Sequence, residues 1–241
     1  MKNLKNKTKI VATIGPASAS KEMLEKLIRS GVNVCRINFS HGSQEDHLEV
    51  IKRVRELDRE LGTHTALLGD LQGPKIRIGD VENNHLELID GHEFTITTEK
   101  MVGTLERIYL SYKEFPKDVE AGERILIDDG KLQLQVVETD RNKNVRVKVL
   151  HGGPLSGKKG VNLPNTKISL PCLTPKDLDD LEFALENNLH WIALSFVRNP
   201  DDIRELREII EKSGKDTRII AKIEKPEAVE NLEEIILETD G

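Results

Sequence analysis

The chain has 241 residues, of which 32% are charged, and a formal net charge of −6. No block of lysine and arginine dominates and no apolar run approaches membrane length, so we expect no nucleic-acid partner and no membrane segment. The basic start is followed by an apolar run that Gly15-Pro16 breaks too early for a signal peptide. Two cysteines, Cys35 and Cys172, suit buried filler in a protein of the reducing cytoplasm.

The N-terminal part of the sequence alternates short β-rich runs with amphipathic segments. Ser20 is placed to cap a first helix, which Gly31 stops. Ser43 and Asp46 resemble a capping box for a second helix, which ends at Gly62. Strand-helix alternation with tight connections is typical of parallel β/α units. Strands are expected at residues 9–15, 34–40 and 65–71.

After Gly73-Pro74 the pattern changes to strict alternation of apolar and polar residues. Runs such as HEFTITT, LQLQVVE and NVRVKVL are separated by turn signals, among them Asp129-Gly130. We place no amphipathic helix in this stretch. The sequence therefore predicts an all-β insert of about a hundred residues, large enough to be a domain of its own.

At Pro171 the β/α rhythm resumes. Helices are expected to begin at Thr174-Pro175 and Asn199-Pro200, with proline at the favoured first helical position. Two more strands are expected, at residues 191–196 and 218–223. A single last helix is expected to bear Val229, Leu232, Ile235 and Ile236.

The expected fold class is α/β, a partial (β/α)8 TIM barrel that supplies strands one to five. An all-β, barrel-like lid domain interrupts it after strand three. The expected domains are a first barrel part, the lid and a second barrel part, at residues 1–73, 74–170 and 171–241.

Polar side chains gather at the C-terminal ends of three expected strands, where β/α barrels bind their ligands. A polar network that plugs the barrel mouth explains the strand-two residues about equally well. An intrastrand salt bridge is the better explanation of the strand-five pair taken alone. Together, the three ends favour a carboxylate that holds Mg²⁺ beside cations that neutralise a moving phosphoryl group. The residues are Arg36, Asn38, Ser40, Asp70, Lys222 and Glu224.

Five strings of the sequence carry a more specific signal. They are TKIVATIGPAS (8–18), RINFSHG (36–42), GPKIR (73–77), KKGVNLP (158–164) and KIE (222–224). In content and order they resemble the signatures of the pyruvate kinase family, in which a mobile lid stands at the place of the β-rich insert. The resemblance implies transfer of a phosphoryl group from phosphoenolpyruvate to ADP, giving pyruvate and ATP, with Mg²⁺ or Mn²⁺ as cofactor.

The resemblance also implies roles for individual residues. Arg36 binds the phosphoryl group, and Lys222 neutralises it as it transfers. Glu224 is one of two carboxylates that hold the divalent ion. The nucleotide is bound by Asn38, Ser40, His41, Arg77 and Lys159. A monovalent cation is bound by Asn38, Ser40, Asp70 and the backbone carbonyl of Leu71. Without the resemblance, His41 is interpreted as a turn residue and Lys158-Lys159 as a solvated charge pair.

The hinge departs from the potassium-dependent members of the family, which read Asp-Thr-Lys-Gly-Pro-Glu-Ile-Arg. Here residues 70–77 read Asp-Leu-Gln-Gly-Pro-Lys-Ile-Arg. Because a tethered ammonium can supply the charge that K⁺ otherwise supplies, we hypothesise that Lys75 replaces K⁺ and that K⁺ is not required. The alternative is that Lys75 is an exposed hinge lysine.

In the family, a second metal ligand and further substrate-binding groups follow the part that this sequence resembles. We therefore expect a truncated kinase with negligible activity alone, whose parent family is usually homo-oligomeric. The alternative is a non-catalytic truncated chain that acts through association or self-assembly of its open sheet edge. Another phosphoenolpyruvate-using barrel enzyme is disfavoured by the β-rich insert.

Overall fold

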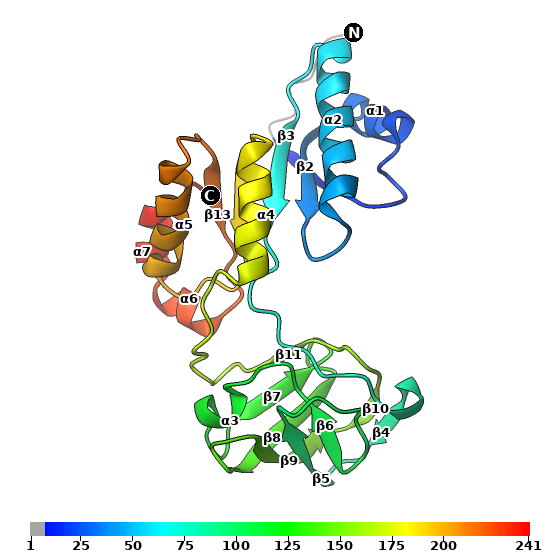
Figure 1. The fold of residues 1–241 in the computed structure, drawn as a ribbon, viewed down its shortest axis with the longest axis vertical. Helices are drawn as coiled ribbons and strands as arrows, with labels where there is room; N and C mark the ends of the chain where they lie inside the picture. Colours follow the sequence, from blue (N-terminus) through cyan, green and yellow to red (C-terminus); the bar gives the residue numbers. More distant parts are fainter. Residues whose placement is uncertain (1–7) are drawn as a thin grey trace. The chain divides into compact units, whose positions relative to one another are not determined.

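The computed structural model describes residues 8–241 (Figure 1). Contacts divide this part of the chain into two compact units. The first comprises residues 8–74 together with Cys172–Gly241, and the second is Lys75–Pro171. The first unit is α/β and the second is built almost entirely of strands (Figure 1).

The first unit is built on a parallel sheet of five strands in the order β1-β2-β3-β12-β13. The strands are β1 (Ile10–Ile14), β2 (Val32–Asn38), β3 (Ala66–Asp70), β12 (Trp191–Leu194) and β13 (Arg218–Ala221). Every neighbouring pair is parallel, so all five C-terminal ends lie at one edge of the sheet. This sheet and its helices confirm the expected partial β/α barrel.

Four helices alternate with these strands along the chain, and their ends show the expected capping. The Ser20 hydroxyl accepts the backbone N–H of Met23, and Ser43 with Asp46 forms a complete capping box. Gly62 ends the second helix in the left-handed conformation, with φ 64°. The helices are α1 (Lys21–Arg29), α2 (Gln44–Leu61), α4 (Pro175–Glu186) and α5 (Pro200–Lys212).

The last helical segment departs from the prediction of a single helix. It is divided into α6 (Pro226–Glu230) and α7 (Leu232–Glu238). Asn231 lies between them at φ −99° and ψ 18°, and its side-chain amide donates to the backbone carbonyls of Glu227 and Arg198. The prediction of one helix was wrong because the helical spacing of the apolar residues continues across this break. Of the four apolar residues, Ile235 is buried, whereas Val229 and Ile236 are mostly exposed.

The second unit is an antiparallel sheet apart from one parallel pair, β5 with β6. Its six strands run in the order β11-β7-β8-β9-β5-β6, and a separate pair joins β10 to β4. Alternate residues of β8, beginning with Leu132 and Leu134, enter a core separate from that of the first unit. This sheet confirms the expected all-β insert, in which α3 (Phe115–Asp118) is one turn long.

The other elements of the second unit are short strands and one 3-10 turn. They are η1 (Glu82–Asn84), β4 (Leu86–Leu88), β5 (Glu93–Thr97), β6 (Arg107–Tyr109), β7 (Arg124–Ile127), β8 (Leu132–Thr139), β9 (Asn144–His151), β10 (Gly153–Leu155) and β11 (Val161–Asn162). Among the helices of residues 8–241, none is both long and apolar enough to cross a membrane.

Candidate active site

A buried carboxylate lies at the centre of the polar edge of the parallel sheet. Asp70 is the last residue of β3, and its side chain is 3% exposed. Its Oδ2 accepts a bond from Nε of Arg36 at 2.7 Å, and its Oδ1 accepts one from Nζ of Lys222 at 3.2 Å. Burying a carboxylate costs several kcal/mol unless cations and hydrogen bonds compensate it. Removal of one partner of a buried ion pair costs on the order of 3–5 kcal/mol of stability. Asp70 therefore fixes the two predicted cations beside each other.

Each of these cations is also held by a hydroxyl from a neighbouring strand. Arg36 donates through Nη1 to Oγ1 of Thr13 on β1 at 2.6 Å. Lys222 donates through Nζ to Oγ of Ser195, just after β12, at 2.8 Å. Thr13 and Ser195 were not among the predicted site residues. The signal that identified Arg36, a polar side chain near the C-terminal end of a strand, would have found both.

Glu224 joins the same cluster three residues after β13 ends. Its Oε2 accepts the backbone N–H of Phe196 at 3.1 Å, and its Oε1 lies 3.5 Å from Nζ of Lys222. Phe196 has φ 57°, a value rare for a bulky residue and often maintained at functional sites. This conformation directs the Phe196 N–H toward Glu224. The Glu224 side chain is 37% exposed.

The carboxylates of the cluster differ in their fit to a divalent ion. Mg²⁺ in proteins is commonly bound through one or two carboxylates, with water and substrate phosphate completing its shell. Glu224 fits this role because it is partly exposed and, within residues 8–241, its Oε1 contacts the Lys222 ammonium alone, whereas both oxygens of Asp70 bind cations. Residues 8–241 contain no group of three or more His, Cys, Asp or Glu side chains that could hold a metal.

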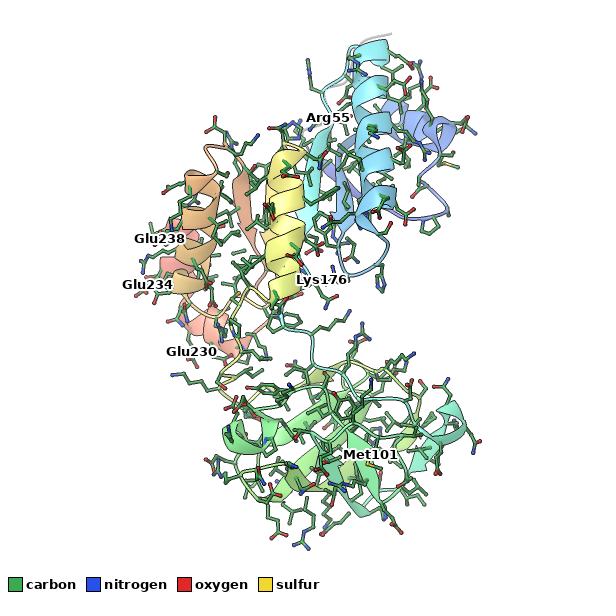
Figure 2. The ribbon with its side chains drawn as sticks, viewed as in Figure 1. Arg55, Met101, Lys176, Glu230, Glu234 and Glu238 are labelled. Atoms are coloured by element: carbon green, nitrogen blue, oxygen red, sulfur yellow. The ribbon has the colours of Figure 1, made fainter. Side chains whose placement is uncertain are left out.

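The loop after β2 brings the next predicted residues to the same edge. Asn38 lies opposite Asp70 in the sheet register, and its side-chain oxygen accepts the backbone N–H of Ser40 at 3.0 Å. The backbone N–H of His41 donates to the Asn38 carbonyl at 3.3 Å. Lys176, labelled on α4 in Figure 2, donates through Nζ to the Phe39 carbonyl at 2.8 Å. The loop is therefore a hydrogen-bonded turn that α4 supports.

Two of the four groups assigned to a monovalent cation already accept hydrogen bonds from the protein. The carbonyl of Leu71 accepts the hydroxyl of Ser195 at 2.6 Å. The carboxylate of Asp70 is bound by Arg36 and Lys222, as described above. A monovalent ion at this place would have to share these oxygens with the protein's own donors.

The remaining predicted residues belong to the second unit. Arg77 donates through Nη1 to the carbonyl of Lys158 at 2.5 Å, and Lys159 pairs through Nζ with Oδ1 of Asp128 at 3.0 Å. Hydrogen bonds from Lys131 and then Lys159 hold the pKa of Asp128 below its usual value. Arg77 and the 158–159 segment are therefore adjacent, and Lys75 is the first residue of this unit.

The two cysteines lie in the core of the first unit. Burial raises the pKa of Cys35 to about 11 and raises that of Cys172 as well. Thiols in this state are poor nucleophiles, which agrees with their interpretation as filler.

Comparison with known proteins identifies the family. The family model described as "Pyruvate kinase, barrel domain" matches residues 5–241. The pyruvate kinase of Staphylococcus saprophyticus is 46% identical over 237 residues, which cover 98% of this chain and 40% of that protein. The pyruvate kinase of Staphylococcus aureus strain MRSA252 is 44% identical over 236 residues, with the same coverage. The chain thus spans 40% of the length of these relatives, and it belongs to the pyruvate kinase family.

Proposed function

We propose that this chain carries the phosphoenolpyruvate-binding part of a pyruvate kinase, which transfers the phosphoryl group to ADP. The observation that supports this most is the binding of Arg36 and Lys222 to the two oxygens of Asp70, at the edge where parallel strands end. Two fixed cations beside a partly exposed carboxylate match the needs of phosphoryl transfer. Membership of the family supports the same reaction.

In this proposal Arg36 and Lys222 bind the phosphoryl oxygens. Their charges stabilise the transition state most, because negative charge on the transferring group must be neutralised without rearrangement of the site. Asp70, Thr13 and Ser195 orient the cations in advance. Mg²⁺ or Mn²⁺ held by Glu224 would supply further positive charge to the phosphoryl oxygens.

Five residues are proposed to contact the nucleotide, as the family resemblance implies. Asn38, Ser40 and His41 come from the loop after β2, and Arg77 and Lys159 come from the second unit. A lysine that binds a phosphate must leave any competing carboxylate, so the Lys159–Asp128 pair would be exchanged for the nucleotide. We further propose that the protein acts in the cytoplasm.

The decisive experiment is a calorimetric titration of the purified chain with phosphoenolpyruvate in the presence of Mg²⁺. We expect saturable binding that Lys222→Met weakens at least tenfold, since a charge-assisted hydrogen bond contributes roughly 1.5–3 kcal/mol. The matched control is Lys212→Met, because Lys212 is an exposed lysine paired with Glu208 on α5. Absence of binding, or equal binding by Lys222→Met, would refute the proposal.

We also propose that Lys75 makes the activity independent of K⁺. The engagement of Asp70 and Leu71 by protein groups supports this, since both would be ligands of the ion. The test uses a completed enzyme, in which the chain is joined to the part of the Staphylococcus saprophyticus pyruvate kinase that the match does not cover. Full activity is expected without monovalent metal ions, and Lys75→Glu should create a K⁺ requirement. If the unmodified enzyme is inactive without monovalent metal ions and K⁺ restores its activity, the hypothesis is wrong.

The 241-residue polypeptide by itself is expected to have negligible turnover. Among the described residues of the cluster, Glu224 is the carboxylate that stays partly exposed, although it contacts Lys222 and the Phe196 N–H, and one carboxylate alone binds a divalent ion weakly. A coupled assay should detect activity only in the completed enzyme. Turnover of the unextended chain at a comparable rate would contradict this.

The second candidate function, association without catalysis, is favoured by one observation. Apolar side chains of α6 and α7 are exposed, with Leu237 85% exposed and Val229 62% exposed. If association is the function, light scattering will show a concentration-dependent oligomer that Leu237→Lys disrupts. A monomer at all concentrations would favour the kinase proposal.

A further inference from the structure

Ser195, in the segment that follows β12, is hydrogen-bonded to Lys222. Ser195 is 2% exposed, and its hydroxyl donates to the carbonyl of Leu71 at 2.6 Å. The same oxygen accepts the bond from Nζ of Lys222 at 2.8 Å. A serine hydroxyl has one hydrogen and two lone pairs, so these two bonds use its donor and one acceptor site. Ser195 thus bridges a cation of the site to the backbone that follows β3.

The same segment also contacts both places where the chain passes between the two units. The chain leaves the first unit at Pro74 and re-enters it at Cys172. The thiol of Cys172 donates to the Ser195 carbonyl at 3.7 Å. On the other side, a Cβ added to Gly73 would lie 3.1 Å from Cβ of Ser195 and 3.0 Å from Cδ2 of Phe196. Both crossing points are therefore packed against Ser195 and its neighbour.

Gly73 has little freedom to absorb a displacement. Its φ is +67°, and its N–H donates to the fully buried carboxylate of Asp177 at 3.0 Å. A displacement of residues 71–73 would therefore be passed to the Ser195 hydroxyl, which is hydrogen-bonded to Leu71. From Ser195 it would reach Lys222.

We propose that Ser195 is a positioning residue, which holds Lys222 in place and couples it to the two crossing points. The proposal rests on the proposed function for its consequence on substrate, because Lys222 is there a phosphoryl-binding group. Asp70 and Ser195 engage two of the three ammonium donors of Lys222, and a ligand would share the third with Glu224, whose Oε1 lies 3.5 Å from Nζ. Without the Ser195 hydroxyl, the Lys222 side chain can adopt more rotamers. Ligand binding then carries the entropic cost of restricting that side chain.

The test compares Ser195→Ala with Thr217→Val in the purified chain. Thr217 is a matched control, since its buried hydroxyl also donates to a backbone carbonyl, that of Leu189 at 2.9 Å, but at the opposite ends of the strands. Affinity for phosphoenolpyruvate with Mg²⁺ should fall roughly two- to tenfold in Ser195→Ala and stay unchanged in Thr217→Val. Amide exchange at Leu71 and Gly73 should be faster in Ser195→Ala alone.

A double-mutant cycle separates positioning from general loss of stability. Lys222→Met should speed exchange at Leu71 and Gly73 when Ser195 is present, and it should add nothing when Ser195 is alanine. Additive effects, unchanged exchange in Ser195→Ala, or an equal effect of Thr217→Val would overturn the proposal. If the unmodified chain fails to bind phosphoenolpyruvate, the proposed function falls, and the exchange cycle alone decides whether Ser195 couples Lys222 to the crossing points.

Discussion

The two units of the chain use charged residues in different ways. In the first unit, parallel strands deliver Arg36, Asp70 and Lys222 to one edge, where a carboxylate that is 3% exposed binds both cations. In the second unit, Asp128 also binds two cations, Lys131 and Lys159, but its side chain is 20% exposed, and other pairs, such as Arg141 with Glu120, are more exposed. Antiparallel strands end alternately at opposite edges, so strand-end polar residues are dispersed. The common direction of the strands thus accounts for the buried cluster of the first unit.

The largest effects should come from the two cores, and they test whether the units are energetically independent. Leu57 on α2 and Leu134 on β8 are both fully buried, each in its own core. Replacement of either by alanine should cost about 2–5 kcal/mol of unfolding free energy. Residue-resolved amide exchange under mild denaturant should show the loss only within the unit that carries the change. A uniform loss over both units would contradict independence.

A smaller effect tests the contrast between buried and exposed charge. Asp70→Asn should destabilise the first unit by about 3 kcal/mol, because it leaves two neighbouring cations without their shared counter-charge. Glu120→Gln should leave the unfolding midpoint unchanged, since exposed pairs contribute little. Chemical denaturation of both variants measures the difference. Equal midpoints would mean that the buried carboxylate is as dispensable as a surface one.

The smallest effect is a pH dependence confined to the second unit. Desolvation opposes ionisation of Asp140, but N–H bonds from Asn144, Asn142 and Lys143 outweigh it and lower the pKa from 3.8 to about 2. A lowered folded-state pKa contributes stability above the unfolded value, and this is lost as pH falls through the folded value. The second unit should therefore weaken between pH 3.8 and 2.

Replacement of Asp140 by asparagine keeps an acceptor oxygen and removes the charge. The Asp140→Asn variant should show a flatter pH profile of the second-unit transition over that interval, measured by acid titration of amide exchange. An unchanged profile would show that other carboxyl groups dominate acid unfolding there.

Local chemistry explains why much of the fold could be predicted. Capping by Ser20 and the Ser43-Asp46 box depend on a few adjacent residues, so the sequence indicates them directly. The meeting of Arg36, Asp70 and Lys222 was also predictable, because parallel strands align their ends. Their roles in catalysis stay predictions.

The parts that escaped prediction depend on longer-range contacts. Thr13 and Ser195 lie at C-terminal strand ends, which the sequence indicates, but their contacts with Arg36 and Lys222 depend on the neighbouring strands. The break at Asn231 depends on the Arg198 carbonyl, which lies far away in sequence. The left-handed conformation of Phe196 likewise has no signal in its own residue type.

The sharing of Asp70 by two cations has a consequence for ligand selection. With Glu224 included, the cluster has two positive and two negative groups, so their formal charges cancel. Such a balanced set holds like charges close together without strong mutual repulsion, but it offers an unaccompanied anion little net attraction. An anion that arrives with a divalent cation can interact favourably with both signs at once. Under the proposed function, this balance of charge is expected to favour a metal-bound anion over the same anion without its metal, before any shape is compared.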